Sequence, residues 1–388
     1  MIKVGIDCHK LEDKTGAQRA GIGRHTYRLI EEISHNRELS EKFRFYLYFK
    51  GHIPDDIPFL ENDIFVKRVA KLPFFIPFFR PSFNIFFHIA LPLYIVKDRV
   101  NVTFFPSFML PAFFPPDIVA KSLVVLTNDI YYEYTQGTLP KKYKIGYQLF
   151  ANWAARYATQ ITTQTYASRE EISGYFNIPK EKIVVVPLGA DIAQTNESTV
   201  PDAEKQNYIF YLGQAFPRRH LKETIQAFEI ISPEFPEIQF IAVGVDKYNP
   251  PVIDKLVGEV NQKLGDRKIH RFEFVSDERL GELYKKAKLF CYISSSEAMG
   301  LPPLEALASG TAPVVADTPT TREIFGDAAF FVKNPDDPKN IAETLREALQ
   351  SREKRENIVR KRKQILSKYT WKGHAEEMVK LFEKVALK

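Results

Sequence analysis

The sequence contains few of the residues that mark specialised classes of protein. Only two cysteines, Cys8 and Cys291, occur in 388 residues, which excludes a disulfide framework and a cysteine-based metal cluster and favours a reducing compartment. The first ten residues, MIKVGIDCHK, lack the apolar core of a signal peptide, so we expect no secretion. The sequence also lacks internal repeats and low-complexity segments.

Charge and length are those of an ordinary globular protein. The net charge of +6 comes from 54 basic and 48 acidic residues, and hydrophobic residues make up 45% of the chain. This modest positive excess suits anionic partners such as phosphates or lipid headgroups, but it is too diffuse to predict nucleic-acid binding. A chain of this length exceeds one ordinary core, so we expect two domains.

Aromatic residues are concentrated in segment 72–96. Phenylalanine accounts for seven of the sixteen residues at positions 72–87. The uncharged run between Arg80 and Lys97 is sixteen residues long and contains two prolines, whereas a membrane-spanning helix needs about 20 apolar residues. Two interpretations stay open: a loop and helix packed on the first domain, or a segment lying in the membrane interface.

Short apolar runs alternate with longer amphipathic stretches along the chain. KVGIDC, SLVVLTND, QITTQT and KIVVVPLGAD read as strands, and RHTYRLIEEIS has helical spacing. In SREEISGYFNI, the spacing of Ser168 and Glu171 predicts a helix capped by the serine. After the polar stretch 191–206 the alternation resumes, from YIFYLG to TAPVVAD.

This alternation predicts an α/β protein with two doubly wound, Rossmann-like domains facing each other across a cleft. Open sheets of this kind bind ligands beyond the carboxyl ends of their strands. The expected divisions are a first domain at 1–190, a linker at 191–206, a second domain at 207–370, and a helix at 371–388 that packs back on the first domain.

Two loops that follow predicted strands could approach an anion. Gly21 and Gly23 precede a predicted helix, where glycine lets the backbone come close to a phosphate. Arg218 and Arg219 also stand just before an amphipathic helix and could form a forked donor set for a diphosphate. The alternatives are a loop without a ligand and a solvated turn.

The stretch SSSEAMGLPPLEALASG places two carboxylates around a helix start. We expect the helix to begin near Pro303 and to end before a C′ glycine, Gly310. Its first N–H groups would attract an anion. Glu297 lies before this helix and Glu305 near its third position. They are either a surface acid and a helix-stabilising acid, or acceptors for the hydroxyls of a bound sugar nucleotide.

Taken together, these motifs resemble the GT4 family of retaining glycosyltransferases, which have the GT-B fold. EAMGLPPLE matches the E-x7-E signature, GIGRHTYRLI the glycine loop, VVLTNDIYYEY the strand ending in His-Asp, and YLGQAFPRRHLKETIQAF the loop with an Arg-Lys pair. FEFVSDERLGELYKKAKLF is similar to the base-binding strand and its following helix. The resemblance covers nearly the whole chain.

The resemblance implies roles residue by residue. The implied catalytic residues are Glu297, Asp129, Arg218, Arg219 and Asn128. The implied donor-binding residues are Gly21, Gly23, Arg218, Arg219, Val275, Glu297, Met299, Gly300, Leu301 and Glu305. Glu305 would hold the ribose, Glu297 the transferred sugar, and the backbone near Val275 the base.

This chain departs from the family pattern at three points. Asn128 stands where many relatives have histidine, and it cannot shuttle a proton at neutral pH. Ala298 and Met299 replace a common Gly-Phe pair, and Arg219 replaces a lysine. The first departure gives more weight to Asp129.

The resemblance implies a hexosyltransferase of polysaccharide or lipopolysaccharide synthesis. The donor would be a nucleoside diphosphate sugar, preferably GDP-mannose, and the acceptor a glycan or lipid-linked glycan. No metal, other cofactor or nucleic acid is expected. We expect a cytoplasmic enzyme that contacts the inner face of the membrane through residues 72–96. The alternatives are a GT-B nucleotide-sugar epimerase and a noncatalytic nucleotide- or membrane-binding regulatory partner.

Overall fold

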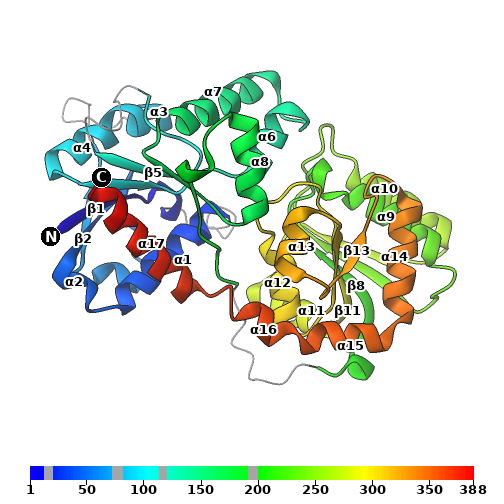
Figure 1. Ribbon diagram of the computed structural model, residues 1–388. Helices are drawn as coiled ribbons and strands as arrows, with labels where there is room; N and C mark the ends of the chain where they lie inside the picture. Colours follow the sequence, from blue (N-terminus) through cyan, green and yellow to red (C-terminus); the bar gives the residue numbers. More distant parts are fainter. Residues whose placement is uncertain (13–20, 72–81, 113–119, 191–199) are drawn as a thin grey trace. The chain divides into compact units, whose positions relative to one another are not determined.

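The chain folds into two units, each built on one parallel sheet (Figure 1). The computed structural model describes residues 1–12, 21–71, 82–112, 120–190 and 200–388. Unit 1 comprises Met1–Tyr131, Ile145–Gly189 and Trp371–Lys388, and unit 2 comprises Tyr132–Lys144 and Ala190–Thr370. The predicted α/β class with two Rossmann-like domains is confirmed.

Unit 1 contains a seven-stranded sheet in the order β3-β2-β1-β4-β5-β6-β7. Its strands are β1 (Ile2–Asp7), β2 (Phe43–Phe49), β3 (Phe65–Val69), β4 (Val102–Phe105), β5 (Lys121–Val125), β6 (Gln160–Thr163) and β7 (Ile183–Val185). Every neighbouring pair is parallel. Parallel strands carry helices on both faces and are therefore buried along their length, as the four buried residues of β4 illustrate.

The helices of unit 1 follow its strands in the chain. They are α1 (Ile22–His35), α2 (Leu39–Lys42), α3 (Phe83–Ile85), the π-helical turn η3 (Phe86–Ala90), α4 (Leu91–Asp98), α6 (Asn128–Thr135), α7 (Lys141–Tyr157), α8 (Tyr166–Phe176) and α17 (Trp371–Ala386). Short 3-10 turns are η1 (His9–Leu11), η2 (Pro58–Glu61) and η4 (Lys180–Lys182). The division into units falls within α6 and α7.

The last helix, α17, completes the core of unit 1. In Figure 1 it runs beside α1, and its residues Met378, Phe382 and Val385 are buried in the cluster that includes β1 and β2. The Phe382 ring lies 6.3 Å from that of Phe45 and 5.9 Å from that of Phe104. The end of the chain thus packs against strands from its beginning.

Unit 2 contains a six-stranded parallel sheet in the order β10-β9-β8-β11-β12-β13. Its strands are β8 (Gln206–Leu212), β9 (Gln239–Val243), β10 (Ile269–Phe272), β11 (Ala287–Tyr292), β12 (Pro313–Ala316) and β13 (Phe330–Val332). Its helices are α9 (Leu221–Ile231), α10 (Ile253–Leu264), α11 (Asp277–Lys286), α12 (Leu301–Ala308), α13 (Pro319–Phe325), α14 (Pro338–Gln350), α15 (Arg352–Arg360) and α16 (Arg362–Leu366), with 3-10 turns η5 (Asp202–Glu204) and η6 (Pro217–Arg219).

The predicted cap of α8 is wrong by three residues. Thr165, not Ser168, is the N-cap, and its hydroxyl accepts a hydrogen bond from the Ser168 amide. Both residues can cap a helix, and the choice depends on where the preceding strand β6 ends. Ser168 and Glu171 instead bond to Asn128, as described below.

Only part of the aromatic segment 72–96 is described, since residues 72–81 lie outside the described ranges. From Phe83 onward the chain is helical through α3, η3 and α4. Phe86 and Phe87 are buried, whereas Leu93 and Val96 are exposed. Within the described residues, no helix combines the length and the apolar character needed to cross a membrane.

Candidate active site

The candidate site of unit 2 lies where the order of its strands reverses. β8 and β11 are neighbours at the centre of the sheet, with β9 and β10 on one side and β12 and β13 on the other. Open α/β sheets bind ligands at such a switch point, outside the carboxyl ends of the strands. The loops that follow β8 and β11 contain the Arg pair and Glu297.

Glu297 is held through a single carboxylate oxygen. Its Oε1 accepts hydrogen bonds from Arg219 Nε at 2.7 Å, Tyr292 OH at 3.0 Å and Ser294 Oγ at 3.2 Å. Arg218 Nη1 forms an ion pair with the same oxygen at 3.4 Å. Burial acts to raise the pKa of Glu297, but the two guanidiniums outweigh it and lower this pKa to about 2. Glu297 is therefore a carboxylate throughout the physiological range.

The two arginines differ in their surroundings. Arg218 is 4% exposed, and its Nε lies 3.4 Å from Oε1 of Glu133, which α6 contributes to unit 2. Arg219 is partly exposed, and its Nη1 donates to the Gln214 carbonyl at 3.1 Å. Among the described residues, its Nη2 group has no hydrogen-bond acceptor. Arg219 can therefore offer two N–H donors to a ligand without losing its bond to Glu297.

Gly213 gives the Arg219 guanidinium room beside the end of β8. A Cβ on Gly213 would lie 3.2 Å from the Tyr292 ring and 3.3 Å from Arg219 Nη1, and its φ of 147° also favours glycine. At the end of β9, a Cβ on Gly244 would lie 2.0 Å from the Gly213 carbonyl oxygen. The sequence signal for this pair is a glycine directly after each strand, in YIFYLG and IQFIAVG.

His220 connects the two loops of the site. Its Nε2 is hydrogen-bonded to Ser295 Oγ, while the Ser295 amide donates to the Arg218 carbonyl at 2.8 Å. His220 is the N-cap of α9 and has a left-handed φ of 45°, which is uncommon for a residue other than glycine. Burial lowers its pKa, so the imidazole is neutral at pH 7. His220, Tyr292 and Ser294 have no motif of their own in the sequence.

The helix after Glu297, α12, begins two residues earlier than predicted. Its N-cap is Gly300, with φ of 77°, and its first turn contains Pro302 and Pro303, where a missing N–H costs no hydrogen bond. Gly310 has φ of 81° just past the C-cap, and this confirms the predicted C′ glycine. The amides of Gly300 and Leu301 thus stand at the helix start, as predicted.

Glu305 is the fifth residue of α12 rather than near the third. It is 7% exposed, and its Oε2 accepts a hydrogen bond from Tyr284 OH on α11 at 3.0 Å. Because Glu305 is buried and accepts this bond, its role is not limited to stabilising the dipole of its own helix. Met299 is also buried, and Val275 lies in the loop between β10 and α11.

The candidate residues of unit 1 form a separate set. Gly21 is the N-cap of α1 with φ of 55°, and Gly23 lies in its first turn. Asn128 is 2% exposed on α6; its Nδ2 donates to Glu171 Oε2 at 2.7 Å and its Oδ1 accepts from Ser168 Oγ at 3.3 Å. Asp129 is half-buried beside it. The roles of all these residues stay predictions.

The second unit is similar in sequence to a known protein family. Residues 194–365 match the family described as glycosyl transferases group 1. The matched residues include Arg218, Arg219, Glu297 and Glu305, so the second unit carries the sequence features of this family. The O-antigen chain mannosyltransferase B of Escherichia coli is 25% identical over 381 residues, covering 94% of this chain and 96% of its own. The O-antigen chain mannosyltransferase RfbU of Salmonella typhimurium is 28% identical over 198 residues, covering 51% of this chain and 53% of its own.

Solved structures of GT-B glycosyltransferases share the fold of this chain. WaaG, a glycosyltransferase involved in lipopolysaccharide biosynthesis, superimposes with a TM-score of 0.69 at 16% identity, over 98% of this chain and 99% of its own. Anabaena Alr3699/HepE in complex with UDP and glucose has a TM-score of 0.69 at 14% identity, over 99% of this chain and 100% of its own. At these identities the likeness concerns the fold alone.

Proposed function

We propose that the protein is a glycosyltransferase that transfers a hexose, preferably mannose, from a nucleoside diphosphate sugar to a glycan or lipid-linked acceptor with retention of configuration. The observation that supports this proposal most directly is the cluster of Glu297, Arg218 and Arg219 at the switch point of the second sheet. Support for mannose comes from the relatives that are named as mannosyltransferases, and GDP-mannose is the preferred donor.

Arg219 and the start of α12 supply positive charge for the leaving diphosphate. As the bond between the sugar and the phosphate breaks, negative charge develops on the phosphate oxygens. Preorganised donors aimed at such charge typically contribute a few kcal/mol each. The Nη2 group of Arg219 and the amides of Gly300 and Leu301 are the proposed donors, and with them we propose transfer without a metal.

Glu297 is proposed to bind the sugar rather than to transfer a proton. Its depressed pKa makes it a poor general acid, and two guanidiniums reduce its strength as a nucleophile. Its Oε1 is occupied, while its Oε2 has no partner among the described residues and can accept a bond from a sugar hydroxyl. Glu305 is proposed to accept bonds from the ribose hydroxyls.

Retention then follows from attack on the same face that the diphosphate leaves. The acceptor oxygen forms the new glycosidic bond, and its proton passes to the departing phosphate oxygen. Asn128, with its amide bonded to Glu171 and Ser168, is proposed as a positioning residue that fixes the start of α6, and Asp129 as the residue beside it that contacts substrate.

The proposed acceptor side of unit 1 includes a membrane contact. Exposed apolar side chains lie on α4, at Leu93 and Val96, and on α7, at Leu149. The two helical segments adjoin, since the His88 ring of η3 stacks on Phe150 of α7 with centroids 5.4 Å apart. Lysines near both segments, such as Lys97, would favour an anionic bilayer.

A donor panel tests the proposed function. We expect GDP-mannose to raise the melting temperature more than UDP-hexoses do, since a donor at about 100 times its Kd adds about 2.7 kcal/mol of stability. Arg219→Ala is expected to remove this shift, and transfer to a lipid-linked acceptor is expected to persist in EDTA. If no nucleotide sugar raises the melting temperature, the proposal is wrong. Turnover of the donor without acceptor would instead favour the epimerase.

A further inference from the structure

A second polar site lies at the amino ends of strands in the second sheet, opposite the carboxyl ends that Glu297 follows. A cavity of about 280 Å³ opens among the segment before β8, the start of β11, the residues before β12 and helix α15. β8 is seven residues long, so its first and last residues are about 20 Å apart at the rise of a parallel strand. The cavity is therefore separate from the Glu297 cluster within the same unit.

The walls of this cavity carry more positive than negative side chains. Its cations are Lys205, Lys288, Arg355, Arg360 and Arg362, and its carboxylates are Asp202 and Glu356. Such an excess on the walls of a cavity attracts anions, because the walls exclude the water that would screen the charges.

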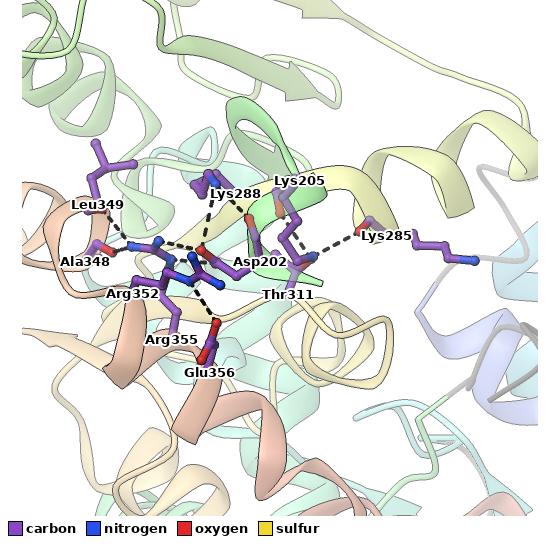
Figure 2. Close-up of polar contacts among 11 residues, drawn as sticks. Asp202, Lys205, Lys285, Lys288, Thr311, Ala348, Leu349, Arg352, Arg355 and Glu356 are labelled. Atoms are coloured by element: carbon purple, nitrogen blue, oxygen red, sulfur yellow. Dashed lines mark hydrogen bonds and ion pairs between the residues drawn. The ribbon is translucent and has the colours of Figure 1, made fainter. Parts of the chain in front are cut away.

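Asp202 is already bonded to two neighbouring cations. Arg355 holds both of its carboxylate oxygens, with Nε–Oδ1 at 2.8 Å and Nη2–Oδ2 at 2.7 Å, and Lys288 donates to its backbone carbonyl at 2.9 Å. Figure 2 shows Asp202 between these two cations. Asp202 thus balances Arg355 and part of the Lys288 charge, and Glu356 lies beside Arg360, so among the described residues Lys205 and Arg362 have no carboxylate within ion-pair distance.

Among these cations, Lys205 gives the strongest indication that the cavity binds an anion. It is 8% exposed, and its ammonium donates to the Lys285 carbonyl at 3.0 Å and to Thr311 Oγ1 at 2.7 Å (Figure 2). Among the described residues, no carboxylate lies within ion-pair distance of it. An ammonium has three N–H donors, so one is left for a further acceptor. Burial lowers the pKa of Lys205 to about 7, and a bound anion would restore its charge.

We propose that this cavity binds a small phosphorylated ligand, whose phosphate or diphosphate group accepts bonds from Lys205, Lys288 and Arg360. Small-molecule pockets begin at about 300 Å³, so the size suits a phosphate ester or pyrophosphate better than a whole nucleotide sugar. A purely structural role of Lys205, tying the end of α11 to Thr311, explains its two bonds. It does not explain Arg360, whose guanidinium is largely exposed at the rim and lies 3.8 Å from Glu356.

Titration calorimetry with inorganic pyrophosphate on the full chain, at fixed ionic strength, tests this proposal. We expect two saturable sites, because the Arg219 cluster is also proposed to bind diphosphates. Lys205→Met and Arg360→Ala should each weaken one site about tenfold or more, while Arg219→Ala weakens only the other. Lys255→Met, the same charge change on an exposed side chain of α10, should leave both unchanged.

The outcomes separate the two sites. Unaltered pyrophosphate binding in both Lys205→Met and Arg360→Ala overturns the proposal; Arg360→Ala alone decides the matter if Lys205→Met does not fold. A site that responds to Lys205 and Arg360 but not to Arg219 supports it even if the donor assignment fails. Tighter binding of hexose 1-phosphate than of inorganic phosphate would identify the ligand as an ester.

Discussion

Glu297 receives four charged or polar contacts through one carboxylate oxygen. Replacing one of its oxygens by an amide nitrogen should therefore disturb the whole cluster. In Glu297→Gln the charge that pairs with Arg219 and Arg218 is lost, so Arg219 loses the partner that orients it toward the proposed donor. We expect kcat to fall about 10²–10³-fold, the usual effect of removing one preorganised polar group, with a smaller effect on KM. Steady-state kinetics with varied donor measures both.

Tyr292→Phe is the matched control for this prediction. It removes one of the donors to Glu297 Oε1 but leaves the ion pairs with Arg219 and Arg218 in place. A neutral hydrogen bond contributes about 1 kcal/mol, so we expect a loss of about fivefold. Equal losses of kcat in Glu297→Gln and Tyr292→Phe would contradict the proposal that the charge of Glu297 orients the arginines.

At the scale of single residues, the sequence predicts which side chains matter better than it predicts their partners. Glu297 and the Arg pair are recognisable from their motif and from their position after strands. Tyr292 is not, because its ring contacts Arg219 only when β11 lies next to β8, and the order of strands in a sheet is not a local property of the chain. For the same reason the engagement of Asn128 by Glu171 could not be read from the sequence.

Among the helices and strands, α17 is expected to contribute measurably to the stability of unit 1. Phe382 is completely buried between Phe45 and Phe104, so Phe382→Ala should destabilise unit 1 by about 3–5 kcal/mol. Lys380→Ala, on the exposed side of the same helix, should change stability by less than about 0.5 kcal/mol. Calorimetric unfolding measures both; equal melting temperatures for the two variants would contradict this account of the core.

A buried histidine pair joins α17 to α1. His374 Nδ1 donates to the Pro187 carbonyl at 2.9 Å, so its Nε2 accepts the proton of His25 Nε2 at 2.8 Å. Burial lowers the pKa of His374 from 6.5 to about 4 and that of His25 in the same direction. The contribution of His374 to stability is therefore complete above pH 6.5 and is lost as the pH falls toward 4, because the unfolded chain binds the proton first.

This linkage predicts an acid-labile unit 1. At pH 5, His374 alone should cost about 2 kcal/mol of unfolding free energy relative to pH 7. His374→Asn keeps a donor for the Pro187 carbonyl but cannot titrate, so its stability should fall less steeply over this range. Denaturant unfolding at several pH values provides the comparison, and parallel pH profiles for the two proteins would refute the role of the pair.

Helices and strands differ in how well the sequence predicts them. Buried parallel strands and amphipathic helices are readable because their apolar period is local. The cap of α8 and the start of α12 are not, since several residues in each stretch could cap a helix and the end of the preceding strand selects among them. β13 has no counterpart in the predicted alternation, because a strand of three residues carries little periodic signal.

At the scale of the whole molecule, a net charge of +6 and the exposed apolar side chains of α4 and α7 lead to a prediction about membranes. The protein should sediment with vesicles that contain anionic lipid, and less so as salt screens the charges over a Debye length of about 10 Å at 0.1 M. Replacing Leu93, Val96 and Leu149 together with serine should reduce this binding without unfolding the protein, because all three are exposed. Ile230→Ser on α9 removes a comparably exposed apolar side chain from unit 2 and should leave binding unchanged. Equal sedimentation of the triple variant and the unmodified chain would mean that the described faces of α4 and α7 do not touch lipid, and the acceptor would then be sought among water-soluble glycans.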